Sequence, residues 1–116
     1  MKALLDTSFI LTCVKQKIDF IEELELLGVS MLIPKEVIVE LKGLSKTRLE
    51  AQTALKILEK SKFSDIELKT KNVDNGIVKF ANENTDILVA TLDREIKSKT
   101  SNKKLIIRGK KKLEIL

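Results

Sequence analysis

The chain lacks most of the side chains that enzymes use as nucleophiles and general bases. Its 116 residues contain no His and a single Cys, Cys13. Without an imidazole, and with its only thiol on an apolar stretch, most catalysis through nitrogen or sulfur is excluded. One Cys cannot form an internal disulfide, so we expect a reduced, buried thiol and no sulfur-bound metal.

Aromatic rings and long apolar runs are also scarce. There is no Trp or Tyr, so stacking of nucleobases on aromatic side chains is not indicated. The first apolar run is broken at Asp6, and none approaches the roughly 20 residues of a membrane helix, which argues against a signal peptide or a transmembrane segment. We therefore expect a cytoplasmic protein with no membrane contact, and its length predicts one domain over residues 1–116.

Positive charge is in excess, and it is unevenly distributed. The net charge is +5, and from Arg94 to the end only Glu95 and Glu114 oppose a long series of basic residues. Such a surface suggests a polyanionic substrate held through its phosphates, whereas a solvated face that promotes solubility is the alternative. The candidate RNA-binding residues are Arg94, Arg108, Lys110, Lys111 and Lys112.

Four acids stand out because each lies where an apolar run ends or near the end of a predicted helix. They are Asp6, Glu40, Asp74 and Asp93, in the segments MKALLD, PKEVIVEL, VDNGIVKFA and DILVATLD. Clustered carboxylates without other catalytic groups are typical of sites for hard divalent cations such as Mg²⁺ or Mn²⁺, which prefer oxygen ligands. This interpretation depends on whether the fold brings the four acids together.

Strands and helices are predicted to alternate along the chain. Continuous apolar runs predict buried strands at residues 3–5, 29–33, 63–68, 87–91, 105–107 and 113–115. Helical spacing and capping residues predict helices after Asp6, over residues 20–27, from Pro34 with Glu40 near its end, over 45–60, from a cap at Asp74, and from a cap at Asp93. This pattern predicts an α/β three-layer sandwich with a mostly parallel central sheet flanked by helices.

The predicted topology places three of the four acids at one edge of the sheet. Asp6 and Asp93 follow strands, and the carboxyl ends of parallel strands meet along the edge where ligands bind in this architecture. Asp74, as a cap of a connecting helix, is expected near the same edge. The position of Glu40 depends on how its helix packs. Lys42 and Arg48 could reach a phosphate near Glu40, although we favour solvation at the surface for both.

Each acid also has a purely structural interpretation. Asp6, Asp74 and Asp93 are good helix N-caps, each contributing about 1 kcal/mol, and Glu40 alone is a solvated helical carboxylate. What favours a site is that gathered carboxylates are costly unless a cation or shared protons relieve their repulsion. The hydroxyl groups of Ser8 and Thr91 could orient the acids, and helix capping is the alternative for both.

The segments LLDTSFI, IPKEVIVEL, VDNGIVKFA and ATLDREIK, in this order, resemble those of a PIN domain, the small α/β nuclease fold of VapC toxins and ribosome-biogenesis endonucleases. The resemblance implies an endoribonuclease that depends on Mg²⁺ or Mn²⁺. It implies a catalytic, metal-binding set of Asp6, Glu40, Asp74 and Asp93, supported by Ser8 and Thr91. RNA, a second copy of the chain, and an antitoxin or a ribosome-assembly protein are the implied partners.

The resemblance has one departure that keeps other functions open. Many relatives carry a second acid directly after the third one, and this chain has Asn75 there, which leaves the number of metal ions open. One alternative is a PIN-like module that binds RNA without cutting it. Another is a phosphoacceptor receiver domain, which would require two adjacent acids after the first strand, where this chain has Asp6 followed by Thr7 and Ser8.

Overall fold

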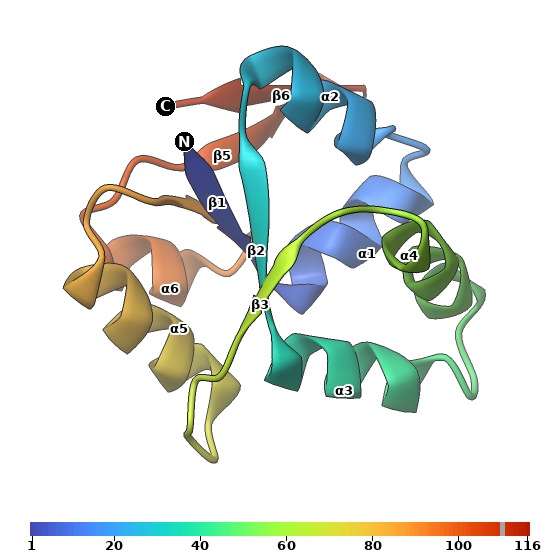
Figure 1. Ribbon diagram of the computed structural model, residues 1–116, viewed down its shortest axis with the longest axis horizontal. Coiled ribbons are helices and arrows are strands. Elements are labelled where there is room, and N and C mark those ends of the chain that lie inside the picture. Colours follow the sequence, from blue (N-terminus) through green and yellow to red (C-terminus); the bar gives the residue numbers. More distant parts are fainter. Residues whose placement is uncertain (110) are drawn as a thin grey trace.

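The computed structural model describes residues 1–109 and 111–116. Helices and strands alternate through most of the chain, as the sequence predicts (Figure 1). The strands are β1 (Lys2–Leu5), β2 (Ser30–Pro34), β3 (Ser64–Ile66), β4 (Leu88–Ala90), β5 (Leu105–Arg108) and β6 (Lys112–Ile115). The helices are α1 (Thr7–Lys15), α2 (Phe20–Leu27), α3 (Lys35–Leu44), α4 (Leu49–Glu59), α5 (Val73–Glu83) and α6 (Arg94–Lys99).

Four of the strands form a parallel sheet in the order β3-β2-β1-β4. The first strand of the chain is thus central and pairs with β2 on one side and β4 on the other. The strand order reverses between β1 and β4, which is where a crevice forms outside the carboxyl ends of the strands in such sheets. Asp6 and Asp93 follow these two strands, as the sequence predicts.

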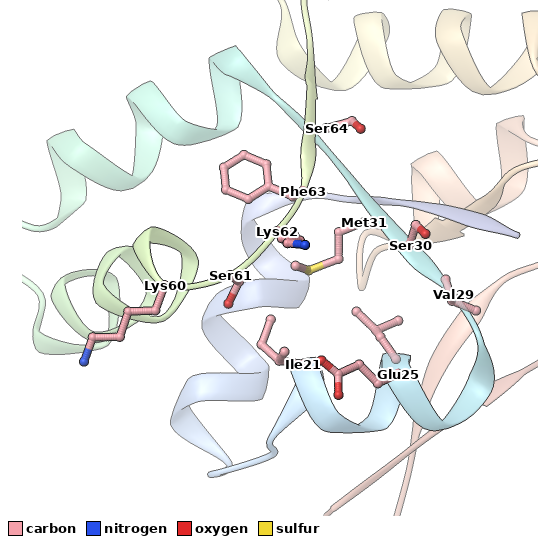
Figure 2. A pocket seen from close by; sticks show the side chains of 11 residues that line it. Ile21, Glu25, Val29, Ser30, Met31, Lys60, Ser61, Lys62, Phe63 and Ser64 are labelled. Carbon is pink, nitrogen blue, oxygen red and sulfur yellow. The ribbon is translucent and has the colours of Figure 1, made fainter.

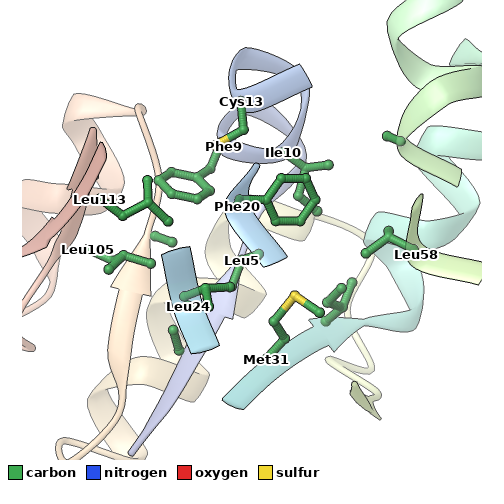
Figure 3. Packing of buried hydrophobic residues seen from close by; sticks show 14 of the residues in the cluster. Leu5, Phe9, Ile10, Cys13, Phe20, Leu24, Met31, Leu58, Leu105 and Leu113 are labelled. Atoms are coloured by element: carbon green, nitrogen blue, oxygen red, sulfur yellow. The ribbon is translucent and has the colours of Figure 1, made fainter. Parts of the chain in front are cut away.

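Helices cover both faces of the sheet, which confirms the predicted three-layer α/β sandwich. Ala3 and Leu5 of β1 face a core shared with α1, α2, α3 and α4, part of which is shown in Figure 3. Leu4 points to the other face and packs with Ile77 of α5 and Ile96 of α6. Because both faces are buried, the strand residues are continuously apolar rather than alternating. Among the described residues, no helix is long and apolar enough to cross a membrane.

The last two strands do not extend the parallel sheet. β5 and β6 pair with each other as an antiparallel hairpin, and a single bridge between Val89 and Lys104 joins the segment to β4. Leu105 and Leu113 close the core beside α1 and α2 (Figure 3). The sequence predicts both strands correctly. It does not show that, among the described residues, only one bridge forms between this segment and β4, which leaves β5 outside the parallel sheet.

The helix predicted over residues 45–60 is wrong at its start. α3 continues to Leu44, and residues 45–48 form a turn before α4 begins at Leu49. The Ser45 hydroxyl group donates to the Lys42 carbonyl at 2.6 Å, and side-chain bonds of this kind compete with helical bonding. The predicted strand at 63–68 is also shorter, because β3 spans only Ser64–Ile66.

The start of α5 also differs from the prediction. Its N-cap is Asn72, whose side chain accepts a hydrogen bond from the Asn75 N–H at 3.0 Å, so Asp74 lies inside the first turn and is not the cap. The helix continues to Glu83, into the stretch at 82–86 that the sequence predicted as a loop. Asn and Asp are about equally good caps, and the residue that is used depends on where the preceding loop is anchored.

Candidate active site

A cleft of about 390 Å³ lies where β1 and β4 end, and we call it the acidic cleft. Four elements or loops bring carboxylates to it from positions far apart in the sequence. All four predicted acids line it together with hydroxyl, apolar and basic side chains. The lining residues are Asp6, Thr7, Ser8, Leu11, Glu40, Leu44, Arg48, Val73, Asp74, Ile77, Leu92 and Asp93.

Asp6 is the buried acid of the cleft, with 6% of its surface exposed. It caps α1, and its Oδ1 accepts hydrogen bonds from the Phe9 N–H and from the Ser8 hydroxyl group, both at 2.9 Å. Its Oδ2 accepts a hydrogen bond from the Thr91 hydroxyl group. Burial raises the pKa of Asp6, these hydrogen bonds lower it, and the charge of Asp74 adds to the rise.

Ser8 and Thr91 tie the end of β1 to the loop after β4. The Thr91 hydroxyl oxygen, which donates to Asp6, also accepts from the Asp93 N–H at 3.0 Å. The Ser8 hydroxyl oxygen accepts from the Leu92 N–H at 3.4 Å. The two hydroxyl groups therefore lie between the first and the last of the four acids, in the place where a supporting residue would be needed.

Asp93 caps α6, as the sequence predicts. Its Oδ1 accepts from the backbone N–H groups of Glu95 at 2.8 Å and Ile96 at 3.3 Å. Within the described part of the chain, its Oδ2 accepts no hydrogen bond, so one oxygen serves the helix and the other is free for a ligand. Asp93 also lines a smaller pocket of about 140 Å³ on the far side of Asp74.

Asp74 and Glu40 are the exposed acids of the cleft. Burial raises the pKa of the Asp74 carboxyl group, followed by the negative charges of Asp93, Glu40 and Glu95. Glu40 is the sixth of the ten residues of α3, so it lies mid-helix and not near the end. The position of α3 after β2 nevertheless brings it to the same cleft as the other three.

The donors of the cleft fit a hard divalent cation in kind, since they are carboxylate and hydroxyl oxygens. Burial is the largest cause of the raised pKa of Asp74, and the repulsion between the acids, which adds to it, is what a bound cation would relieve. In the part of the chain that the structure describes, no three acidic, His or Cys residues already stand close enough to enclose an ion.

The predicted RNA-binding residues are not gathered at the cleft. Arg94 directly follows Asp93 and is exposed. Arg108 and Lys112 lie on the hairpin, with Lys111 in the adjoining turn, and Arg108 pairs with Glu114. Lys110 lies outside the described residues. Figure 1 shows the hairpin beside α2, well away from the helices α3 and α5 that carry Glu40 and Asp74.

Sequence reasoning underrated Arg48, which lines the acidic cleft. Lys42, which we grouped with it, lines a different hollow beside α4. No local sequence pattern distinguishes Arg48 from Lys42. Arg48 reaches the cleft because a turn at residues 45–48 interrupts the stretch that was predicted to be helical. The hydroxyl oxygen of Thr7 is a second feature without a sequence signal, since it is buried and has no hydrogen-bond partner in the described residues.

A larger pocket, of about 650 Å³, lies at the other end of the sheet. Residues at the starts of β2 and β3 line this pocket, and Figure 2 shows Met31, Phe63 and Ile21 among its apolar side chains. Glu25 is its one carboxylate, and Lys60 and Lys62 are its cations. It has more space than the acidic cleft, but it has one carboxylate and two lysines where the cleft has four acids, so the smaller cleft is the better candidate site for a cation.

Comparisons with known proteins give the class to which this fold belongs. The sequence matches the PIN like domain family over residues 3–110, so the chain belongs to this family. The structure of the PIN domain endonuclease Utp24 is similar, with a TM-score of 0.81 and 26% identity over 98% of this chain and 90% of that one. No curated protein matches the sequence.

A second solved structure is similar in fold. It is the crystal structure of VapBC2 from Rickettsia felis bound to a DNA fragment from their promoter, with a TM-score of 0.65 and 20% identity over 90% of this chain and 98% of that one. At that identity the likeness concerns the fold alone. Membership of the PIN family and the likeness to an endonuclease support a nuclease, which is a hydrolase, as the general class of this chain.

Proposed function

We propose that the chain is an endoribonuclease that depends on Mg²⁺ or Mn²⁺ and hydrolyses phosphodiester bonds in RNA. The observation that carries the proposal is that Asp6, Glu40, Asp74 and Asp93, from four separate segments, line one cleft. Burial, and then repulsion from the neighbouring acids, raises the pKa of Asp74, and such perturbed carboxylates occur mainly at functional sites. The four acids together are a suitable site for a divalent cation.

The four acids have different roles in this proposal. Asp6 and Asp93 are the direct ligands, because each presents a carboxylate fixed by hydrogen bonds to a helix start. Asp74 is a ligand of a second ion, and Glu40 is a ligand or positions the attacking water. When bound, the cation supplies Lewis acidity and charge neutralisation at the scissile phosphate. Ser8 and Thr91 keep the Asp6 carboxylate oriented.

Basic residues would hold the RNA strand outside the cleft. Arg94 is next to Asp93, and Arg108, Lys111 and Lys112 belong to the region of the hairpin, while Lys110 directly precedes Lys111 in the sequence, so these basic residues would contact phosphates along an extended strand. Single-stranded or loop regions suit an open cleft, because metal, water and one phosphate must be brought into line there. A second copy of the chain and an antitoxin or ribosome-assembly protein remain proposed partners.

Cleavage of a flexible RNA with and without a chelator tests the proposal. The purified protein should cut it with Mg²⁺ or Mn²⁺ and stop when the ion is chelated. Asp93→Asn keeps the cap on α6 and removes the charge that the cation needs, so cutting should stop while the fold is retained. Asp86→Asn, at an exposed acid outside the cleft, is the matched control and should cut normally. Equal cutting by Asp93→Asn and the control would refute the site.

The second candidate, a module that binds RNA without cutting it, rests on Asn75. This residue lines the small pocket beside Asp74 and Asp93, and it stands where many relatives carry a second acid directly after the third one. If RNA binds with a marked salt dependence but no ion supports cleavage, this second function replaces the first.

A further inference from the structure

We infer that Arg48 binds the phosphate group that is cut, so that the cleft recognises its substrate by an arginine on the α3–α4 turn. This inference rests on the proposed function and names a residue that holds the substrate. Arg48 is the one basic side chain among the described residues that line the acidic cleft. It faces the same space as all four acids.

The backbone at Arg48 is firmly held. Its N–H donates to the Leu44 carbonyl at 2.9 Å, and its own carbonyl accepts from the Gln52 N–H at 3.3 Å. The Gln52 side chain closes the turn by donating to the Ser45 carbonyl at 2.8 Å. The base of the arginine is thus fixed between two helices, and the long side chain is the part that can move.

The guanidinium group has no partner in the described part of the chain. The ion pairs formed there involve Lys35, Lys99 and Arg108, and Arg48 pairs with none of the acids that share its cleft. An arginine that already neutralised Glu40 or Asp74 would be structural. An unpaired, exposed arginine at an anionic cleft is free to take an anion that enters.

Arg48 is also a poor choice for the helix that it begins. It occupies the N-cap of α4 and makes no side-chain capping bond there. Ser, Thr, Asp or Asn would cap the helix, and a cation lies unfavourably at the positive end of the helix dipole. Residues that conflict with their local structure are found mainly at functional sites, which is the second reason to assign this residue to the substrate.

Phosphate is the anion that this arrangement fits. A guanidinium group presents parallel N–H donors that match two oxygens of one phosphate. A phosphodiester brought against four carboxylates meets strong repulsion, and a cation in the same cleft lowers it together with the metal ion. Arg48 would therefore orient the scissile phosphate between itself and the carboxylates.

Replacing Arg48 with Ser separates this role from a structural one, because the two roles predict opposite changes in the melting temperature. A structural arginine would stabilise the fold, so its loss would lower the melting temperature. Arg48→Ser supplies a proper cap, so its melting temperature should equal or exceed that of the unmodified protein. Its cleavage of RNA should fall by about 10²-fold, the usual loss when one preorganised charged donor is removed. The slope of log Kd against log salt for single-stranded RNA should fall by about 0.7, which corresponds to one phosphate contact.

The control is Lys46→Ser, which removes an exposed cation from the same turn that does not line the cleft. It should change neither cleavage nor the salt slope. Arg48→Lys, which keeps the charge but loses the paired donors, should recover the salt slope and only part of the cleavage rate. If Arg48→Ser cuts and binds like Lys46→Ser, the inference is overturned.

The same measurements distinguish failure of this inference from failure of the proposed function. If the unmodified protein binds RNA but never cuts it, the proposed function falls. A loss of binding in Arg48→Ser, with none in Lys46→Ser, would then still support the phosphate contact. If the unmodified protein cuts RNA and Arg48→Ser cuts it equally fast, only the role of Arg48 is refuted.

Discussion

The pockets at the two ends of the parallel sheet differ in size and in the charges that line them. Where β2 and β3 begin, the pocket is larger, and it combines apolar side chains with one carboxylate, Glu25, and with Lys60 and Lys62 near the end of α4. Where β1 and β4 end, the cleft is smaller and acidic, and the helices α1 and α6 begin there. Helix starts favour carboxylates and helix ends favour cations. Under the proposed function, the direction of the strands, and not the size of the pocket, marks the end of the sheet that carries the active site.

The largest expected effect compares one acid at each end of the sheet. Asp6→Asn should lower RNA cleavage by about 10²–10³-fold, the usual cost of removing one group from a preorganised electrostatic site. Asn retains the cap on α1, so the melting temperature should change little. Glu25→Gln, in the larger pocket, should leave cleavage unchanged. If Glu25→Gln cut RNA more slowly than Asp6→Asn, the active site would lie at the other end of the sheet.

A smaller effect concerns the packing that holds Asp74 in place. A Cβ atom added at Gly76 would lie 2.3 Å from Thr70 Cγ2 and 3.0 Å from Leu68 Cβ. Gly76→Ala should therefore lower the free energy of unfolding by about 1–3 kcal/mol in urea titrations. Gly43→Ala, where the added Cβ meets nothing within 4 Å, should instead gain up to about 1 kcal/mol.

Cleavage should follow the same order as stability in these two variants. Gly76→Ala displaces the start of α5 and with it Asp74, so it should cut more slowly than Gly43→Ala under conditions where both are fully folded. Equal rates and equal stabilities would mean that the contact between α5 and the preceding loop does not position the acid.

The smallest expected effect is the pH dependence of Asp74. Its pKa is raised from the ordinary value of 3.8 in the folded state, so the folded state binds this proton more tightly than the unfolded state does. Stability from this group is fully present below pH 3.8 and is lost as pH rises through the raised pKa. In chelator at neutral pH, Asp74→Asn should therefore be more stable, by a few tenths of a kcal/mol because water screens an exposed acid.

Thermal unfolding across pH measures this difference, and Mg²⁺ should reverse it. The gain in Asp74→Asn should vanish below pH 3.8, where Asp74 is protonated in both states. Adding Mg²⁺ should stabilise the unmodified protein more than the variant, since the ion binds the folded carboxylates. A gain that persists unchanged at low pH would indicate better helix capping instead of relieved repulsion.

The parts of the site that the sequence predicts are those fixed by local rules. An apolar strand followed by Asp at a helix start is a local pattern, and it correctly located Asp6 and Asp93 at the carboxyl ends of β1 and β4. The alternation of strands and helices predicted the layers for the same reason. The cap of α5 could not be predicted, because Asn72 and Asp74 are equally suitable for that role in isolation.

What decides the start of α5 is a contact between distant segments. The Glu36 carboxylate accepts hydrogen bonds from the N–H groups of Leu68 at 3.1 Å and Lys69 at 3.2 Å, which anchors the loop before the helix. The location of Arg48 depends in the same way on the turn between α3 and α4, inside a stretch predicted as continuous helix. Glu40 likewise reaches the cleft through the packing of α3, which no short segment of sequence encodes.

The central position of β1 has a consequence for how the cleft comes into being. Asp6 precedes its hydroxyl partner Thr91 by 85 residues, and Asp93 comes after that. A growing chain emerges from the ribosome with its N-terminus first. It therefore carries Asp6 for a time without the strand that completes the cleft. Under the proposed function, the site is assembled only once β4 has docked beside β1, and we expect shorter nascent chains not to cut RNA.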